Sequence, residues 1–281
     1  MNREMAEIIR VMSRTHARDI SLHDPAFLAK SIERRLAATG IKTAAAYGGH
    51  LSENSTEAEA LSRALNINYS EFFRNPLTFA LLEQVILPGL AVEKEKAGRA
   101  EIRVWSAACA AGQEAYSIAI LLHDLTTARG GAISYRIFAT DRSDAEIVAA
   151  QEGVYDSAAV HNVRWKHLRR YFTQEGESYT IIPALRNRIG FSVYDLLDEL
   201  RASPPQSIFG DFDLAVCSNL LFYYRPDIRR RILNKIWKSL AAGGYLVTGE
   251  AEIDIVARHE GFRAAIPTSA VFQKTNGRSD P

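Results

Sequence analysis

The first ninety residues place hydrophobic positions at the spacing of amphipathic helices. Apolar side chains recur three or four residues apart, as at Ala58 and Leu61, and no alternation typical of a strand interrupts them. Asp24 and Pro25 indicate a helix start, because aspartate caps free backbone N–H groups and proline fits the first turn. The pattern predicts an all-helical domain over residues 1–90.

The end of this domain is marked by a change in composition. A helix begins near Pro76, and Pro88 with Gly89 predicts its end, because proline cannot continue a helix. The charged stretch VEKEKAGRAE follows and contains Gly98. We therefore predict a linker over residues 91–100.

After residue 100, short apolar runs alternate with amphipathic segments. Strands are expected at 101–107, 135–140, 212–219, 244–250 and 269–274, and helices at 114–125, 144–151 and 226–240. Such alternation is typical of a parallel sheet with helices on both faces. Residues 155–190 break the pattern, with one helical segment and the short strands SYTII and RIGFSV, so we expect a small inserted β-subdomain. The sequence predicts an α/β domain over residues 101–274 and a tail at 275–281.

Composition narrows the class of protein. Apolar residues make up 47% of the chain, as in globular proteins with a filled core. Because 34 Lys and Arg balance 33 Asp and Glu, no global field attracts nucleic acid, and we expect none as a partner. The apolar stretches are shorter than the ~18–20 residues of a membrane span, and we see no secretory signal, so we expect a cytoplasmic protein without membrane insertion. Two cysteines, Cys109 and Cys217, argue against a disulfide framework.

The loop after the first expected strand is a candidate ligand site. In AACAAGQEAYS, small residues let the backbone turn tightly before a helix whose N-terminal amides can face a ligand. Asp141 ends the next strand, where doubly wound folds place an acid against ribose hydroxyls. Taken singly, an ordinary strand–helix turn and a solvated aspartate are the alternatives. Together they favour an adenosine-containing cofactor, and both nicotinamide and S-adenosylmethionine satisfy this geometry.

Two aromatic segments also carry polar residues. NYSEFFRN holds Arg74 after two phenylalanines, and FDLAVCSNLLFYY places Asn219 and Tyr223 after a buried strand. Core packing of the aromatic side chains is the alternative for both segments. The basic run at 229–231 lies opposite an apolar stripe and is assigned to a solvated helix face. The histidines show no paired metal-ligand spacing, so we expect no metal.

In this order, the segments resemble the chemotaxis receptor methyltransferase (CheR) family over about residues 8–274. The family's N-x-T-x-F-F-R is matched by NYSEFFR, R-V-W-S-A-A-x-x-x-G-E-E-P-Y-S by RVWSAACAAGQEAYS, A-T/S-D-I-D by ATDRS, R-Y-F by residues 170–172, and F-D-x-I-x-C-R-N-V-x-I-Y-F by FDLAVCSNLLFYY. The resemblance implies a helical N-terminal domain and a Rossmann-like S-adenosylmethionine methyltransferase sheet with a small β-subdomain. The implied activity is O-methylation of glutamate side chains on the cytoplasmic domains of chemoreceptors, and we expect a monomer.

The resemblance also implies a set of site residues. Its cofactor-binding positions fall on Asn68, Ser70, Arg74, Glu114, Asp141, Asp195, Leu196, Ser218 and Asn219, and its catalytic positions on Arg74 and Tyr223. Methyl transfer to an ionised carboxylate needs no strong base, so positioning and desolvation should dominate. An arginine fork and a phenol can hold a carboxylate oxygen without taking its proton.

The sequence departs from the family at several of these positions. Ser218 replaces the arginine of C-R-N, which removes one of two cations expected at the acceptor pocket, and Asp195 replaces an asparagine. In the helical domain, the basic positions that the family uses against receptors reduce to Lys30, Arg34 and Arg35. Two alternatives therefore stay open: a methyltransferase of this fold with a different acceptor, and a non-enzymatic module that senses the cofactor or binds a partner.

Overall fold

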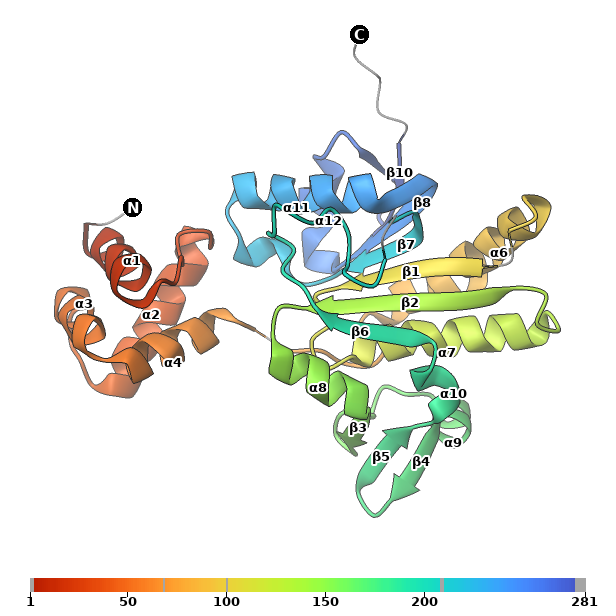
Figure 1. Ribbon diagram of the computed structural model, residues 1–281, viewed down its shortest axis with the longest axis horizontal. Helices are drawn as coiled ribbons and strands as arrows, with labels where there is room; N and C mark the ends of the chain where they lie inside the picture. The colour runs from red at the N-terminus through yellow and green to blue at the C-terminus, as the bar shows by residue number, and fades with distance from the viewer. Residues whose placement is uncertain (1–2, 68, 100, 208–209, 276–281) are drawn as a thin grey trace, which may run out of the picture. The chain divides into compact units, whose positions relative to one another are not determined.

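The computed structural model describes residues 3–67, 69–99, 101–207 and 210–275 (Figure 1). The chain forms two compact units, Met1–Ile67 with Phe222–Arg229, and Asn68–Leu221 with Arg230–Pro281. The division after Ile67 corrects the boundary expected near residue 90. The physical reason is that the helix after Pro76 contributes its apolar side chains to the core of the second unit.

The first unit is helical. It contains α1 (Arg3–His16), α2 (Pro25–Thr39), α3 (Ala44–Glu53) and α4 (Ser55–Leu65). Buried apolar side chains that include Ile8 and Leu61 form its core. The predicted start of α2 is confirmed, because Asp24 Oδ1 accepts the N–H groups of Ala26 and Phe27 at 3.0 and 3.3 Å.

A buried ion pair joins α2 to α4 in this unit. Arg35 donates from Nε and Nη2 to the two carboxylate oxygens of Glu57, at 2.9 and 2.6 Å, and the Tyr47 hydroxyl donates to Glu57 Oε1 at 2.5 Å. The hydrogen bonds from Arg35 hold the pKa of Glu57 below its ordinary value. Arg35 is therefore occupied inside the unit, which corrects its expected place on a receptor-facing surface.

The segment Phe222–Arg229 also belongs to the helical unit. The Asp24 N–H donates to the Tyr223 carbonyl at 2.8 Å, and the Phe27 and Tyr223 ring centroids lie 4.7 Å apart. Arg229 forms an ion pair with the same aspartate at 3.3 Å. The start of α2 thus packs against the residues that begin α11 (Pro226–Ser239).

The second unit is built on a seven-stranded sheet with the order β6-β2-β1-β7-β8-β10-β9 (Figure 1). The strands are β1 (Glu101–Ala107), β2 (Ser134–Asp141), β6 (Ile189–Val193), β7 (Phe212–Cys217), β8 (Leu240–Thr248), β9 (Phe262–Ala264) and β10 (Val271–Lys274). β6, β2, β1, β7 and β8 run parallel, while β10 pairs antiparallel with β8 and β9. The chain passes from β1 to β2 on one side and returns to β7 on the other, which is the switch point of a doubly wound fold. The predicted α/β class is confirmed.

A continuous helical segment precedes the sheet. It consists of α5 (Pro76–Leu81), the π-helical turn η1 (Leu82–Ile86) and α6 (Leu87–Lys96). The predicted stop at Pro88 is wrong, and α6 runs through most of the predicted linker. In the π-helical turn, the Leu87 N–H donates to the Leu82 carbonyl five residues back, and this wider turn accommodates a proline that cannot donate a hydrogen bond.

The same segment is long and apolar enough to cross a membrane by length and composition alone, a result that concerns only the described residues. Its side chains nevertheless have partners in the sheet unit. Leu82, Ile86 and Leu90 belong to the hydrophobic core, and Lys94 Nζ lies 2.8 Å from Asp213 Oδ1 in a buried ion pair. These contacts are those of a core helix.

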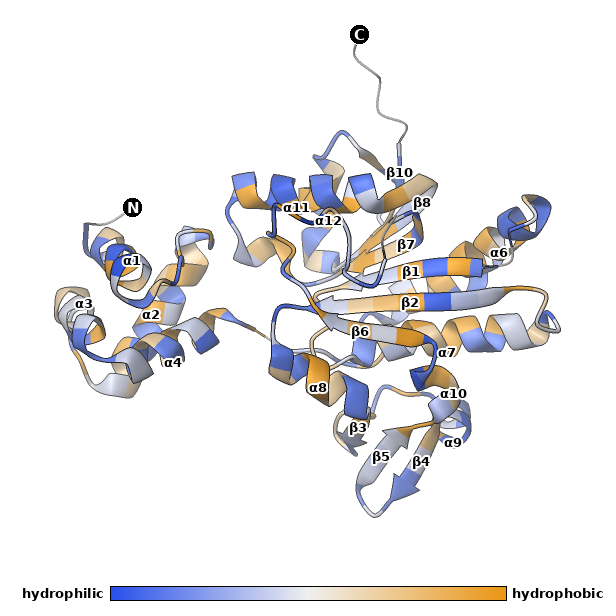
Figure 2. Ribbon diagram, viewed as in Figure 1, coloured by the Kyte–Doolittle hydropathy of each residue, from blue (hydrophilic) through white to orange (hydrophobic). Residues whose placement is uncertain are grey.

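Helices lie on both sides of the sheet. On one side α6 packs against α7 (Gln113–Ala128), and α8 (Asp144–Glu152) packs against β2 and β6, whereas α11 and α12 (Ile253–Ala257) lie on the other side (Figure 1). β1 serves both sides, because Val104 joins the core cluster with α7 while Trp105 packs near Phe212. Figure 2 shows hydrophilic bands along α11, where Arg230 and Arg231 are exposed as predicted for a solvated face.

A second, three-stranded sheet has the order β3-β5-β4. Its strands are β3 (Val154–Asp156), β4 (Phe172–Glu175) and β5 (Ser178–Ile181), accompanied by α9 (Trp165–Tyr171) and α10 (Pro183–Arg186). The segment RIGFSV does not belong to it, contrary to expectation. It forms β6, whose Ile189 pairs with Ile137 of β2, because buried apolar residues complete that edge of the main sheet.

The connection from α11 to β8 also differs from the prediction. α11 ends at Ser239, and β8 begins at Leu240 rather than at 244, so Gly244 lies inside the strand. A Cβ at Gly244 would lie 2.9 Å from the Phe212 carbonyl oxygen, so glycine permits the close approach of β7 where the strand register shifts. Short 3₁₀ turns, η2 (Leu221–Tyr223) and η3 (Glu250–Glu252), follow β7 and β8.

Candidate functional site

Small residues form the turn between β1 and α7. Ala108, Ala110 and Gly112 have φ angles of 62°, 46° and 90°, in the left-handed region that side chains rarely adopt. A Cβ on Gly112 would lie 3.0 Å from Ala150 Cβ and 3.3 Å from the Tyr155 hydroxyl oxygen. Glycine is therefore required both by conformation and by space, and the predicted tight turn lies at the carboxyl end of β1.

Asp141 joins this turn to the end of β2. It is 7% exposed, and its Oδ2 accepts the Ala110 N–H at 3.0 Å while Oδ1 accepts the Ser143 N–H at 2.9 Å. Each carboxylate oxygen can accept a further hydrogen bond. Asp141 is thus held rigidly at the switch point and keeps acceptors for a pair of hydroxyl groups such as those of a ribose.

Glu114 lies in the first turn of α7, beside the end of β7. It accepts a hydrogen bond from the Ser106 hydroxyl at 2.7 Å and another from Ser218. Burial raises the pKa of Glu114 to about 7, and the Glu252 carboxylate acts in the same direction, whereas Arg74 and the two hydroxyls oppose the shift. The carboxyl group is therefore about half ionised at neutral pH, and a cationic ligand would favour its ionised form.

Glu252 organises the turn after β7. Its Oε1 accepts the Leu221 N–H at 2.6 Å, and its Oε2 accepts the N–H groups of Asn219 and Gly249 at 2.7 and 3.0 Å and the Thr248 hydroxyl at 2.9 Å. Glu252 is fully buried and is not among the residues predicted from sequence. A glutamate three residues after a glycine at a strand end is the signal that could have identified it.

The segment that carries Arg74 is anchored in the sheet unit, not in the helical domain as expected. Phe72 is fully buried and packs edge-on against aromatic neighbours, and the Phe73 N–H donates to Ser117 Oγ at 3.0 Å. Arg74 Nη1 donates to the Tyr69 carbonyl at 3.3 Å, and the guanidinium lies 5.1 Å from the centroid of that ring. The phenylalanine segment therefore packs into the core of the sheet unit, and Arg74 is held in place by its contacts with Tyr69.

Asp195 and Leu196 follow β6 beside Asp141. The Tyr194 N–H donates to the Asp141 carbonyl at 2.8 Å, which ties the two strand ends together. Asp195 is exposed and its Oδ1 accepts the Leu197 N–H at 2.8 Å, while Leu196 is buried. Both residues therefore stand at the same edge of the sheet as Asp141.

The structure gathers part of the predicted set at these strand ends. Asn68 lies outside the described residues, and Ser70 is half-buried in the segment before Phe72. Tyr223 belongs to the helical unit, where its ring packs against Phe27. The predicted residues that the structure gathers at or beside the carboxyl ends of β1, β2, β6 and β7 are Glu114, Asp141, Asp195, Leu196, Ser218 and Asn219.

The two cysteines lie near these carboxylates but are buried. Burial raises the pKa of both thiols well above the ordinary value, with Asp141 and Glu114 adding to the effect at Cys109, and Glu252 and Glu114 at Cys217. Both therefore stay protonated at neutral pH. In the described parts of the chain, no group of three or more His, Cys, Asp and Glu side chains is arranged to hold a metal ion.

A cavity of about 410 Å³ adjoins the end of β8. Leu77 and Leu81 of α5 line it together with Glu250 and Ile253. Leu77 is 81% exposed, although it is a large apolar residue, and it lies three positions after Arg74. The groove therefore lies next to the segment that carries this arginine.

Comparisons with known proteins agree with this geometry. The sequence profile described as "CheR methyltransferase, SAM binding domain" matches residues 68–267. A chemotaxis protein methyltransferase 1 of Pseudomonas aeruginosa is 34% identical over 69% of this chain and 69% of its own, and a chemotaxis protein methyltransferase of Listeria innocua is 30% identical over 85% and 87%. An uncharacterized 104.1 kDa protein of Rhodobacter capsulatus is 33% identical over 88% of this chain, which spans a quarter of that protein's length.

The cofactor of this profile, S-adenosylmethionine, fits the described residues. Asp141 offers acceptors to two ribose hydroxyls. Glu114 offers a carboxylate whose ionised form is favoured by positively charged sulfonium and ammonium groups. Only small side chains stand in the turn from Ala108 to Gly112, which lies at the carboxyl end of β1.

Proposed function

Because the chain belongs to the CheR family of S-adenosylmethionine-dependent methyltransferases, we propose that it methylates glutamate side chains in the cytoplasmic domains of chemoreceptors. The names of two relatives support a place in chemotactic signalling. The observation that carries the proposal is Arg74, a cation held within electrostatic reach of Glu114. A cation beside the carboxylate of the cofactor site suits an anionic acceptor. The enzyme then works as a cytoplasmic monomer.

The side chains of the site act by positioning. Bound S-adenosylmethionine supplies a methyl group on a sulfonium centre. When the methyl group is transferred, the sulfur leaves as a neutral thioether, which is a good leaving group. A glutamate acceptor is ionised at neutral pH, so no side chain has to remove its proton. Asp141 holds the ribose and Arg74 one oxygen of the acceptor carboxylate, so that the reacting atoms meet without further loss of orientational freedom.

The acceptor polypeptide needs a surface beside the reacting atoms, and we place its flanking residues in the groove lined by Leu77, Leu81 and Ile253. Leu77→Ser should raise the KM for the protein acceptor several-fold and leave cofactor affinity unchanged, because apolar contact is lost only with the acceptor. Leu200→Ser is the matched control, since Leu200 is also highly exposed, at 96%, but lies outside the groove. Equal KM values for the two variants would remove the groove from the acceptor site.

The helical unit offers a basic face for an acidic receptor. Lys30 and Arg34 are exposed one helical turn apart on α2, whereas Arg35 is bound to Glu57. Arg34→Glu should raise the KM for the receptor, with an effect that shrinks at high salt. Arg14→Glu, the same change at an exposed residue of α1, is the control and should leave this KM unaltered.

The proposal is tested by incubating the protein with radiolabelled S-adenosylmethionine and membranes that contain candidate chemoreceptors. Methyl esters of glutamate are cleaved by alkali, so we expect label on the receptor that alkali removes. Label on the receptor that survives alkali, or no label on any receptor, would contradict a glutamate acceptor.

One observation favours a second candidate, a methyltransferase with a different acceptor. Ser218 stands where the family has an arginine, and its hydroxyl hydrogen-bonds to Glu114. The pocket thereby loses one cation and keeps its carboxylates, which suits a neutral or basic acceptor better than the family pattern does. Alkali-stable label on a protein substrate would support this candidate.

A further inference from the structure

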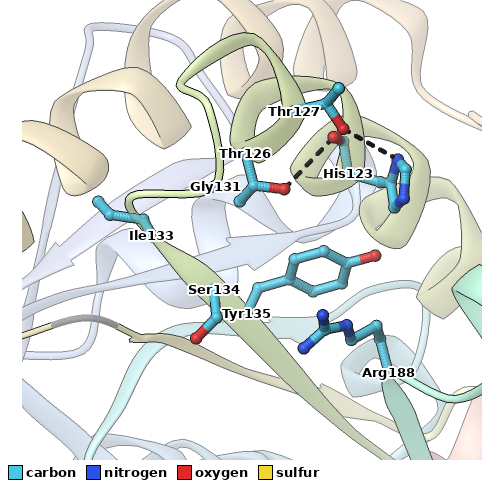
Figure 3. Close-up of a pocket in the computed structure, with 8 residues that line it drawn as sticks. All are labelled: His123, Thr126, Thr127, Gly131, Ile133, Ser134, Tyr135 and Arg188. Carbon is cyan, nitrogen blue, oxygen red and sulfur yellow. Dashed lines mark hydrogen bonds between the residues drawn. The ribbon is translucent and has the colours of Figure 1, made fainter.

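A cavity of about 210 Å³ lies at the edge of the sheet opposite to the cofactor site (Figure 3). Tyr135 lines it from the start of β2, which ends at Asp141 on the other edge. His123 and Thr127 line it from the last turns of α7, and Arg188 from the residue before β6. None of these residues takes part in the methyl-transfer site.

Tyr135 brings an unused hydrogen-bond donor to this cavity. The residue is 2% exposed, and among the described residues its hydroxyl has no hydrogen-bond partner. Burial raises the pKa of Tyr135, so the group stays a neutral O–H donor. A buried hydroxyl without a partner destabilises the fold, and a ligand acceptor would recover the lost hydrogen bond.

Arg188 brings a positive charge. Its guanidinium lies 5.8 Å from the centroid of the Tyr135 ring, and Figure 3 shows the two side chains next to each other. Arg188 takes part in none of the ion pairs found among the described residues, and no Asp or Glu lines the cavity. The guanidinium fork is therefore available for an anion.

The remaining groups around the cavity do not neutralise this charge. Burial lowers the pKa of His123, and the charges of Arg170 and Arg188 act in the same direction, so the imidazole is neutral. The charge of Asp124 opposes that shift, but this carboxylate is occupied: it accepts hydrogen bonds from His167, Arg170 and Tyr171. The cavity therefore combines a cation and hydroxyl donors without a free acid.

We propose that this cavity binds a small oxyanion, a carboxylate or phosphate group, between the Arg188 guanidinium and the Tyr135 hydroxyl. The guanidinium fork matches two oxygens of such a group, and the tyrosine donates to one of them. The site is separate from the methyl-transfer site, so its occupation does not depend on the proposed acceptor.

Calorimetric titration of the full chain with inorganic phosphate and, separately, with acetate tests the proposal. We expect wild-type protein to bind at least one of them, and the one that binds identifies the phosphate or the carboxylate class. Arg188→Gln should weaken binding at least tenfold, and Tyr135→Phe several-fold without lowering stability, because the lost hydroxyl has no protein partner. Arg136→Gln is the control, an exposed arginine on the same strand with the same change of charge.

A second readout keeps the test independent of the variants. The pKa of His123, followed by NMR in wild-type protein, should rise when the anion binds, because a negative charge beside an imidazole favours its protonated form. Arg188→Lys keeps the charge but loses the fork, and should bind less tightly than wild type. Absence of binding by both anions, or equal binding by wild type and Arg188→Gln, would overturn the proposal.

Discussion

The carboxylate of Glu252 holds Asn219 in a left-handed conformation. Glu252 Oε2 lies 2.7 Å from the Asn219 backbone nitrogen, and the φ of Asn219 is 60°. Asparagine adopts this region more readily than most residues, but it still needs support. Because the other carboxylate oxygen binds the N–H of Leu221, one buried side chain fixes the whole turn that presents Asn219.

Glu252→Gln should destabilise the protein by about 2–4 kcal/mol, because a buried amide cannot satisfy all the donors that the carboxylate satisfies. Denaturant unfolding measures the change. Glu250→Gln, two residues away and exposed, is the matched control and should change stability by less than about 0.5 kcal/mol. If the two variants are equally stable, Glu252 is not the support of this turn.

Asp141→Asn should weaken S-adenosylmethionine binding by about 1.5 kcal/mol or more, roughly tenfold, because a charged acceptor to the ribose is replaced by a neutral amide. Asp144→Asn, an exposed carboxylate at the start of α8, should bind like wild type. Calorimetry compares the three proteins. Wild-type affinity in Asp141→Asn would remove this residue from the cofactor site.

Cofactor affinity should rise with pH between pH 6 and pH 8. Burial holds the pKa of Glu114 at about 7, above its ordinary value of 4.5, so the group is protonated below neutral pH, and a positively charged ligand binds its ionised form better. Requiring the ionised form gives a rise of about tenfold over this range. In Glu114→Gln, the profile should be flat, and an unchanged slope would exclude Glu114 as its source.

The same titration affects the stability of the cofactor-free protein. The pKa of Glu114 is higher in the folded state than in the unfolded state. At a pH between the two values, the folded protein keeps a proton on this group that the unfolded chain has lost. Stability from this group is fully present below about pH 4.5 and is lost as pH rises through about 7. Glu114→Gln should remove this component from the pH dependence of unfolding.

Ser218→Arg tests the main departure from the family pattern. If the acceptor is a glutamate, a cation beside Glu114 should leave the transfer rate unchanged or raise it, since it favours an anionic acceptor. Cofactor affinity, measured by calorimetry, serves as the control for folding. Loss of transfer with intact cofactor binding would favour a neutral or basic acceptor.

Elements with a strong local pattern could be predicted from the sequence. The bounds predicted for β1, 101–107, agree with the structure, because β-branched and aromatic residues such as Val104 and Trp105 favour a strand. The helix stop at Pro88 failed because packing of Leu87 and Leu90 on the sheet outweighs the local preference of proline. β9, at three residues, is too short to give a periodic signal.

Site residues with a local sequence signal could likewise be predicted, whereas those that act through distant partners could not. Asp141 and Glu114 follow motifs that sequence reasoning can place at a strand end and a helix start. Glu252 acts on backbone N–H groups more than thirty residues away, which no local pattern records. Arg35 pairs with Glu57, 22 positions later in the chain. The basic pattern of its own helix therefore predicts a surface position and cannot show this partner.

Transfer of the methyl group to a glutamate carboxylate is tested most directly by mass spectrometry of a purified chemoreceptor cytoplasmic domain. The domain is incubated with this protein and S-adenosylmethionine, digested, and compared before and after alkali. We expect peptides heavier by one methylene group, with the addition on glutamate side chains and lost in alkali. A methyl group found on lysine, arginine or cysteine instead, or a receptor domain left unmodified while the protein binds its cofactor, would contradict the proposed activity.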